Sequence, residues 1–159
     1  MTVAPCPVLQ DALLQRYVGQ GASYTDCFVA SVSAPVALPQ FISAFYGSSV
    51  FGAERWILSL ATRRRISADA IAALAAGDST IFAVWHVEAR LPEQILLKDK
   101  GGYTASWLGV AHDGTGTRVM LGSAIISQRG RLPLAVRSII PLHRAYSKTL
   151  LRSAVKQLE

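Results

Sequence analysis

The longest regular pattern of apolar and polar positions in the chain runs from Leu132 to Leu158. At 3.6 residues per turn, one side of this stretch collects apolar and small residues, and the other side collects cations. The first side holds Val136, Ile139, Ile140, His143, Ser147, Leu150, Ala154 and Leu158, and the second holds Arg137, Arg144, Lys148, Arg152 and Lys156. The pattern predicts a long terminal helix with one buried face, which needs a broad surface to lie against.

The segments before this helix show the alternation of apolar and polar residues that is typical of β-strands. We predict a first strand over residues 23–33, and later strands over 80–90, 94–98, 103–111 and 117–127. Turns containing Gly, Pro and Asp separate the later strands. Because these connections are short, we expect consecutive strands to pair antiparallel.

Helical spacing between the first strand and the others predicts helices over residues 38–46, 51–62 and 68–76. The order is therefore one strand, two or three short helices, an antiparallel run of strands and one long helix. We expect an α+β fold in which a curved antiparallel sheet packs on the C-terminal helix, the helix-grip arrangement. We divide the chain into an N-terminal lead-in segment, residues 1–21, and a single domain, residues 22–159.

Composition adds one question to this picture. Hydrophobic residues make up 51% of the 159 residues and the mean hydropathy is +0.32, which is high for a globular domain. A large core, a cavity or a buried subunit interface would each account for it. The N-terminus lacks the pattern of a signal peptide, and prolines interrupt the one long uncharged run, residues 27–53. Cys6 and Cys27 are too few for a disulfide framework, so we expect a cytoplasmic protein without membrane insertion.

The net charge of +6 is concentrated in the last third of the chain. Residues 101–159 hold eight Lys and Arg against two acidic residues, and no acid lies between Arg137 and Lys156. Such a row could meet anionic lipid, nucleic acid or an acidic partner, but it also suits a merely solvated helix face. We prefer the solvated face and expect no nucleic-acid partner.

Two stretches resemble a known family. The run Ile95-Leu96-Leu97-Lys98-Asp99-Lys100, followed by Tyr103-Thr104-Ala105-Ser106, and the later Pro141-Leu142-His143-Arg144 resemble the signatures of the bacterial DUF2867 family, a domain of unknown function. The resemblance extends over residues 22–156. It implies similarity to the Bet v 1/START-like (SRPBCC, polyketide cyclase-like) helix-grip superfamily, whose members hold lipids, polyketides and other apolar ligands. Gly101-Gly102 replace a His-Leu pair that the family more often carries, so a polar role for this turn is in doubt.

His143 is the main candidate for chemistry, because it lies in the apolar stripe of the terminal helix and should point at the sheet. It could orient a ligand or transfer protons near neutral pH, or it could be a buried histidine that is satisfied by a neighbouring strand. His86 and Glu88 also share a strand face, but no third ligand lies at a diagnostic spacing. We predict no metal site and no cofactor.

Three functions remain open. The leading hypothesis is a domain that binds a small apolar ligand in a cavity between the sheet and the C-terminal helix. The predicted cavity candidates are Phe28, Trp85 (or Phe82), Tyr103, Trp107, Met120, Ile139, His143 and Tyr146. The first alternative is a cyclase- or hydratase-like enzyme that uses His143 with an acid such as Asp26 or Asp99. The second alternative is a protein-interaction module or homodimer without a cavity.

Overall fold

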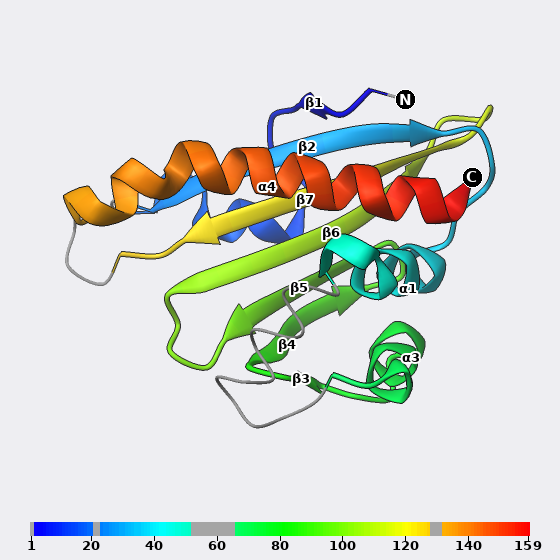
Figure 1. Ribbon diagram of the computed structural model, residues 1–159, viewed down its shortest axis with the longest axis horizontal. Helices are drawn as coiled ribbons and strands as arrows, with labels where there is room; N and C mark the ends of the chain where they lie inside the picture. Colours follow the sequence, from blue (N-terminus) through cyan, green and yellow to red (C-terminus); the bar gives the residue numbers. More distant parts are fainter. Residues whose placement is uncertain (1, 21–22, 52–65, 128–131) are drawn as a thin grey trace.

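The computed structural model describes residues 2–20, 23–51, 66–127 and 132–159, which build one seven-stranded sheet and a set of helices (Figure 1). The strands are β1 (Ala4–Pro5), β2 (Tyr24–Val32), β3 (Ile81–Phe82), β4 (Trp85–Leu91), β5 (Gln94–Asp99), β6 (Thr104–His112) and β7 (Thr117–Ile125). The helices are the short 3-10 helix η1 (Leu13–Tyr17), α1 (Leu38–Gly47), α3 (Ala68–Ala76) and α4 (Leu134–Leu158).

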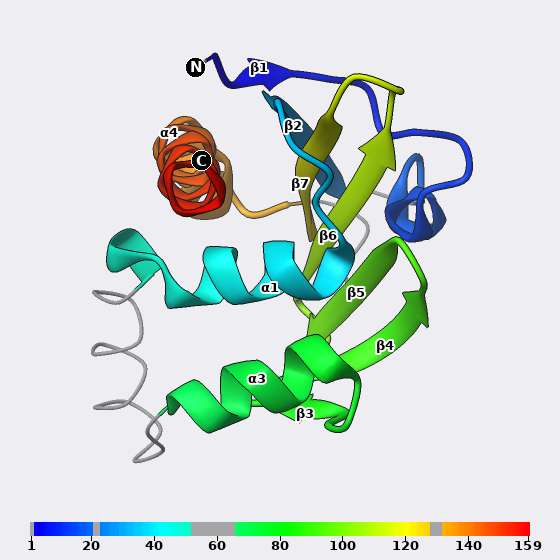
Figure 2. The ribbon, with the colours of Figure 1, turned by 90° about the vertical axis from the view of Figure 1, so that its right-hand side faces the viewer.

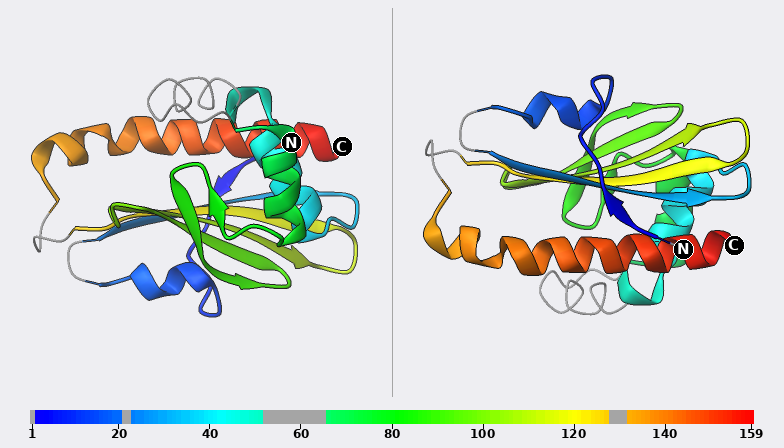
Figure 3. Two further views of the ribbon diagram at one scale, coloured as in Figure 1. Left: turned by 90° about the horizontal axis from the view of Figure 1, so that it is seen from below. Right: turned by 90° about the horizontal axis from the view of Figure 1, so that it is seen from above.

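The sheet order is β1-β2-β7-β6-β5-β4-β3, and each neighbouring pair is antiparallel. The strands β3 to β7 follow one another as a meander, whereas β2 pairs with the last strand along its whole length, from Tyr24 opposite Ile125 to Val32 opposite Thr117. Helix α4 runs along one face of this sheet (Figure 3), and α1 and α3 cover the same side near the C-terminal end of α4 (Figure 2). The predicted fold class, a curved antiparallel sheet on a long C-terminal helix with short helices after the first long strand, is confirmed.

Most predicted boundaries lie within one or two residues of the observed ones, with one informative difference. The strand expected over 80–90 is interrupted after Phe82, where Ala83 adopts a left-handed conformation with φ of 54°, and a new strand starts at Trp85. This turn is hard to predict from the sequence, because its four residues are all apolar and none is Gly or Pro. The helix predicted over 51–62 lies almost entirely outside the described residues.

The face of the sheet toward α1, α3 and α4, here called the inner face, carries the larger core. Phe28, Leu97, Leu108 and Leu121 project from four strands and are almost completely buried beneath these helices. Helix α4 contributes only from its second half, where its buried residues are Ser147, Leu150, Leu151, Ala154 and Val155. The first half of α4 therefore lies on the sheet without sealing it.

The opposite face, here called the outer face, is covered by the N-terminal segment. Leu14 of η1 is fully buried against Trp107, Leu96 and Met120. A Cβ atom added to Gly122 would lie 2.5 Å from Leu14 Cδ2, so a glycine is needed at this point of β7 to let η1 approach. The residues expected to form a lead-in segment are thus packed on the sheet.

The two cysteines meet at the edge where this segment begins. The amide of Cys6 donates to the carbonyl of Cys27 over 3.0 Å, and the two sulfur atoms lie 2.9 Å apart as free thiols. The thiol of Cys6 donates to the Cys27 sulfur, and the contact between the two sulfur atoms lowers the pKa of Cys6 while it raises the pKa of Cys27. The spacing of the cysteines in the sequence does not reveal this contact, since it depends on how β1 pairs with β2.

Candidate functional site

A pocket of about 300 Å³ opens between the first half of α4 and the inner face of the sheet. Strands β6 and β7 form its floor, α4 forms one wall, and α1 with the residues after it forms the other. Its lining residues are Phe45, Tyr46, Phe51, Trp85, Thr104, Ala105, Ser106, Leu121, Ser123, Ala124, Ile125, Ile139, His143, Tyr146, Ser147 and Leu150. The volume lies at the lower end of the range typical of sites for small organic ligands.

One end of the pocket is aromatic. The ring of Tyr46 stands edge-on to Phe45 and Phe51 with centroid separations of 5.0 and 4.9 Å, and it lies 4.6 Å from Phe82. The ring of Phe82 in turn stacks on Trp85. Mutual packing of this kind fixes the rings, so they form a firm apolar wall.

The other end is polar and centres on Ser123. Its hydroxyl donates to Oδ1 of Asp26 on the neighbouring strand. The oxygen atom of the Ser123 hydroxyl also lies 2.8 Å from Nε2 of His143 on α4. The hydroxyl of Tyr24 donates to Oδ2 of Asp26 over 2.9 Å, and His143 Nε2 lies 3.8 Å from that oxygen. Asp26 is 8% exposed, whereas the side chain of His143 keeps 32% of its surface accessible. The histidine is therefore the accessible member of a buried polar cluster.

The donors and acceptors of the cluster determine the direction of each hydrogen bond in it. Because the Ser123 hydroxyl gives its proton to Asp26, the contact with His143 is satisfied when Nε2 carries a proton and donates to the serine oxygen. The carboxylate contacts the serine and not the second ring nitrogen of the histidine, so this is not the arrangement that activates a serine nucleophile. It instead suits a histidine whose Nδ1 atom binds or exchanges a proton with a pocket ligand.

The buried carboxylate also acts on Tyr24. Burial, and then the hydrogen bond and charge of Asp26, raise the pKa of Tyr24 to about 12, against a smaller opposing effect of Arg144. Tyr24 therefore stays a neutral hydrogen-bond donor over the whole physiological range.

Some of the predicted cavity candidates line the pocket, and others lie elsewhere in the fold. Trp85, Ile139, His143 and Tyr146 lie together in the lining of the pocket. Phe28 is on the inner face but is covered by Arg144 and Lys148, whose charged groups lie 5.8 and 5.6 Å from the centre of its ring. Tyr103, in the turn before β6, is 58% exposed. Phe82, the alternative to Trp85, is buried in the core of the inner face and is not part of the pocket lining.

Trp107 and Met120 lie on the outer face, away from the pocket, and their placement as cavity residues is corrected here. Both are buried in the cluster around Leu14. Successive side chains of a strand point to opposite faces, so Leu108 and Leu121, their neighbours in sequence, take the inner positions. Both faces carry large apolar residues, and the pattern alone therefore could not assign the faces.

Ser106 and Ser123 were not among the predicted residues, although both line the pocket. Alternate residues of a strand point to the same face. Ser106 is two positions before Leu108 and Ser123 is two positions after Leu121, so the inner positions of the leucines predict inner positions for both serines. A polar residue on an otherwise apolar face was the available signal.

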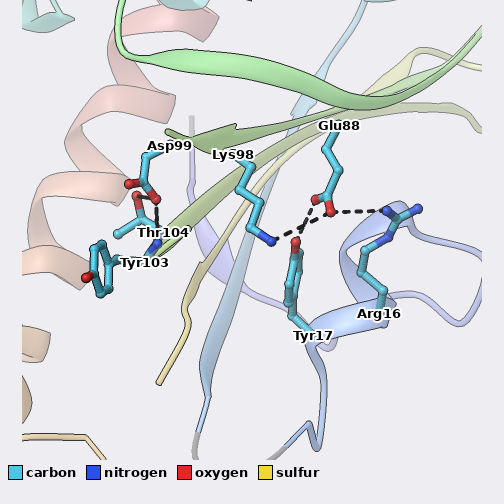
Figure 4. A network of polar contacts seen from close by, with 7 residues as sticks. All are labelled: Arg16, Tyr17, Glu88, Lys98, Asp99, Tyr103 and Thr104. Carbon is cyan, nitrogen blue, oxygen red and sulfur yellow. Dashed lines mark hydrogen bonds and ion pairs between the residues drawn. The ribbon is translucent and has the colours of Figure 1, made fainter. Parts of the chain in front are cut away.

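Two carboxylates considered in the sequence are engaged elsewhere (Figure 4). Glu88 lies at a β-bulge between Val87 and Ala89 and accepts a 2.6 Å hydrogen bond from Tyr17 of η1. Asp99 accepts from the backbone amides of Gly101, Tyr103 and Thr104 and so holds the β5–β6 turn.

Of the two acids suggested as partners of His143, Asp26 is the one in its vicinity. No group of three or more His, Cys, Asp or Glu side chains in the described residues could hold a metal ion.

A second depression, of about 710 Å³, lies where the C-terminal end of α4 meets the start of α1. Its lining includes Val36, Gln40, Ala44, Gln157 and Leu158 and contains no aromatic or titratable side chain. We therefore place the candidate site at the smaller pocket, where enclosure and chemistry coincide.

The topology defines the class of protein: a helix-grip domain with a pocket under its terminal helix. No family model matches the chain, and no curated protein matches it. Among solved structures, it is similar to Ara h 8.0201, with a TM-score of 0.41, 8% identity, and coverage of 86% of this chain and 99% of that one.

It is also similar to CalU16 from Micromonospora echinospora, with a TM-score of 0.36, 11% identity, and coverage of 83% of this chain and 76% of that one. In the described residues, no helix is long and apolar enough to cross a membrane.

Proposed function

We propose that this chain is a cytoplasmic binding protein for a small, mainly apolar molecule that carries one polar group. The observation that supports the proposal is the polarity of the pocket, which is aromatic at one end and has the Ser123–His143–Asp26 cluster at the other. An apolar body would lie against Tyr46 and Trp85, and a hydroxyl, carbonyl or carboxyl group would meet His143. Few but well-placed polar groups in an apolar pocket are typical of ligand sites.

The DUF2867 resemblance belongs to the same proposal. Its two stretches are the β5–β6 turn and the first half of α4, and these border the pocket through Thr104 and His143. A family whose distinctive residues gather at one opening would be expected to share a ligand site there.

A direct test is to fill the pocket. Ser106 lies on the floor, and a leucine at this position would extend into the cavity. We expect the wild-type protein to bind one molecule of the neutral dye N-phenyl-1-naphthylamine per chain, measured by its fluorescence. Ser106→Leu should weaken this binding by about tenfold or more, which corresponds to about 1.4 kcal/mol.

The matched control is Ser31→Leu, the same change at an exposed position of β2. It should leave dye binding unchanged. Equal binding by both variants, or no saturable binding by the wild-type protein, would contradict the proposal.

An enzyme of the cyclase or hydratase kind is the second candidate function, and one observation favours it. His143 is accessible, lies in the pocket and shares Ser123 with a buried carboxylate, which is a suitable environment for a group that transfers protons. For an enzyme, His143→Gln should preserve dye binding and cost about 10²-fold or more in turnover of the natural ligand. For a binding protein, dye binding is retained and the ligand is released chemically unchanged.

A further inference from the structure

The first half of α4 is exposed in a way that the pocket does not explain. Every buried residue of this helix lies at Ser147 or beyond, although the helix begins at Leu134. Leu134 is 80% exposed, Leu142 is 73% exposed and Ile139 is 55% exposed. These three large aliphatic side chains on a single half-helix form an exposed apolar patch, and apolar groups gathered on a surface mark sites of contact with proteins or membranes.

The charge around this patch has one sign. Helix α4 has no acidic residue from Leu134 to Leu158, and it carries Arg137, Arg144, Lys148, Arg152 and Lys156. None of these five cations forms an ion pair with another described residue. Arg144 and Lys148 also lie over the ring of Phe28 on the sheet. Arg137, Arg152 and Lys156 are exposed on the same helix that presents the exposed leucines.

Leu134 and Leu142 lie on the exposed side of the helix, with Arg137 on one flank and Ile139 on the other. At 100° per residue, Leu134, Arg152 and Lys156 lie within about 40° of one another, and Leu142 lies about 80° from Leu134. Arg137, Arg144 and Lys148 flank this sector, on the side away from Ile139. In Figure 3, α4 runs along the edge of the molecule, and its N-terminal end is remote from α1 and α3. Helix α4 begins at Leu134.

We propose that the first half of α4 adsorbs to anionic lipid surfaces, with Leu134, Leu142 and Ile139 at the acyl boundary and the arginines on the headgroups. A helix that is apolar and cationic on its exposed side, with no acid, has the composition of an interfacial helix. The helix lies in the plane of the surface and does not span the bilayer. Charge complementarity selects this occupant over a second copy of the chain, because two copies meeting through this helix would bring like charges together.

The exposed patch adjoins the pocket. Ile139 belongs both to the exposed patch and to the lining of the pocket, and His143 lies one turn further on. Adsorption through this half-helix would bring the mouth of the pocket to the lipid surface. A molecule dissolved in the bilayer could then enter the pocket without crossing water. The adsorption itself does not depend on the proposed ligand binding.

The test is co-sedimentation with vesicles of phosphatidylcholine and phosphatidylserine in a 3:1 ratio, compared with vesicles of phosphatidylcholine alone. We expect binding to the anionic vesicles only, and a loss of about tenfold or more when NaCl is raised from 50 to 500 mM in the assay. The variant Arg137→Gln should weaken binding about fivefold, because one cation near an anionic surface contributes about that factor. The exposed Arg118→Gln on β7 is its matched control.

The hydrophobic part is tested by Leu134→Ser with Leu142→Ser. The matched control is Ile81→Ser with Leu91→Ser, two apolar side chains that are 55% and 46% exposed at the opposite edge of the sheet. The α4 pair should lose about tenfold or more in vesicle binding, and the control pair should lose less than about twofold. Both pairs are exposed, so both variants should fold.

Three results would overturn the proposal: no binding to anionic vesicles by the folded wild-type protein, equal losses in the two serine pairs, or a dimer that the α4 pair dissociates. Ser106→Leu should keep vesicle binding while it loses the dye. Failure of the lipid proposal and failure of the pocket proposal are therefore distinguishable.

Discussion

The two faces of the sheet are built from the same strands but differ in how completely the helices bury their apolar residues. On the outer face, the five-residue helix η1 closes over Trp107, and the side chains of Trp107 and of Leu14 in η1 are both fully buried. On the inner face, a 25-residue helix buries residues only along its second half and leaves a pocket under its first half. The shorter helix therefore buries its side of the sheet more completely than the longer one. The length of α4 is not what leaves the pocket open.

The outer face serves stability and the inner face combines stability with a candidate binding site. The outer face combines shape and hydrogen bonding: Gln94 accepts from the Leu13 amide over 2.8 Å and from Trp107 Nε1 over 3.0 Å. The inner face combines a packed core at one end with accessible polar groups at the other. We therefore expect substitutions on the outer face to change the free energy of unfolding, and substitutions at the pocket to change binding.

The largest effect is expected for Trp107→Ala. Removing a fully buried indole from the outer face should lower the free energy of unfolding by about 3–5 kcal/mol. Trp85→Ala, at the partly exposed pocket wall, should cost less stability and should weaken dye binding. Denaturant unfolding of both variants measures the difference, and a larger loss of stability for Trp85→Ala would show that the outer face is not the more important one for stability.

The next effect concerns the hydrogen bonds that hold the N-terminal segment. Gln94→Leu leaves the Leu13 amide and the Trp107 ring nitrogen without their acceptor, which should cost about 1–3 kcal/mol. Gln157→Leu is the control, because that side chain makes one exposed hydrogen bond to Gly47. Similar losses in chemical denaturation for the two variants would show that Gln94 does not fasten the segment.

A smaller effect is expected at the polar end of the pocket. Ser123→Ala removes the hydroxyl shared by Asp26 and His143 and should cost about 1 kcal/mol, because a buried carboxylate loses a donor. Ser106→Ala, on the same floor, should be nearly neutral. Thermal unfolding compares the two, and an equal shift in Tm would remove Ser123 from the centre of the cluster.

The cysteine pair gives a prediction in reactivity and not in stability. Cys6 is partly exposed and its hydrogen bond with Cys27 lowers its pKa, whereas the same hydrogen bond and then burial raise the pKa of Cys27. The thiolate is the reactive form, so Cys6 should be alkylated by iodoacetamide roughly tenfold faster or more, and its reaction should begin at a lower pH. Peptide mapping after brief labelling measures both rates. Faster labelling of Cys27 would contradict this assignment of the two thiols.

The order of elements could be predicted from the sequence because each element carries a local signal. The helix over Ala68–Ala76 begins after Ser67, whose hydroxyl accepts from the Ala70 amide, and ends at Gly77 with a positive φ. Those cap residues were visible in the sequence. The terminal helix was equally visible, since its period extends over 25 residues.

The site was predicted only in part, because its remaining features depend on contacts between distant segments. Helix spacing in the sequence predicts that His143 points toward the sheet. Its contact with Ser123 could not be predicted, because it depends on the register of β7 against β2, which places Ser123 opposite Asp26. Strand alternation could not decide between Trp107 and Leu108 as the inner residue, since both are large and apolar. The packing of Leu14 on the outer face decides it, and that contact joins residues far apart in the sequence.

Native mass spectrometry of the purified protein, with solvent extraction and identification of what is released, is the decisive test of ligand binding in the pocket. We expect a small, mainly apolar molecule with one polar group, bound once per chain, retained by Ser31→Leu and lost from Ser106→Leu. A wild-type protein that carries no such molecule and appears as a clean dimer would contradict it. The high hydrophobicity of the chain would then belong to an interface between subunits and not to a ligand site.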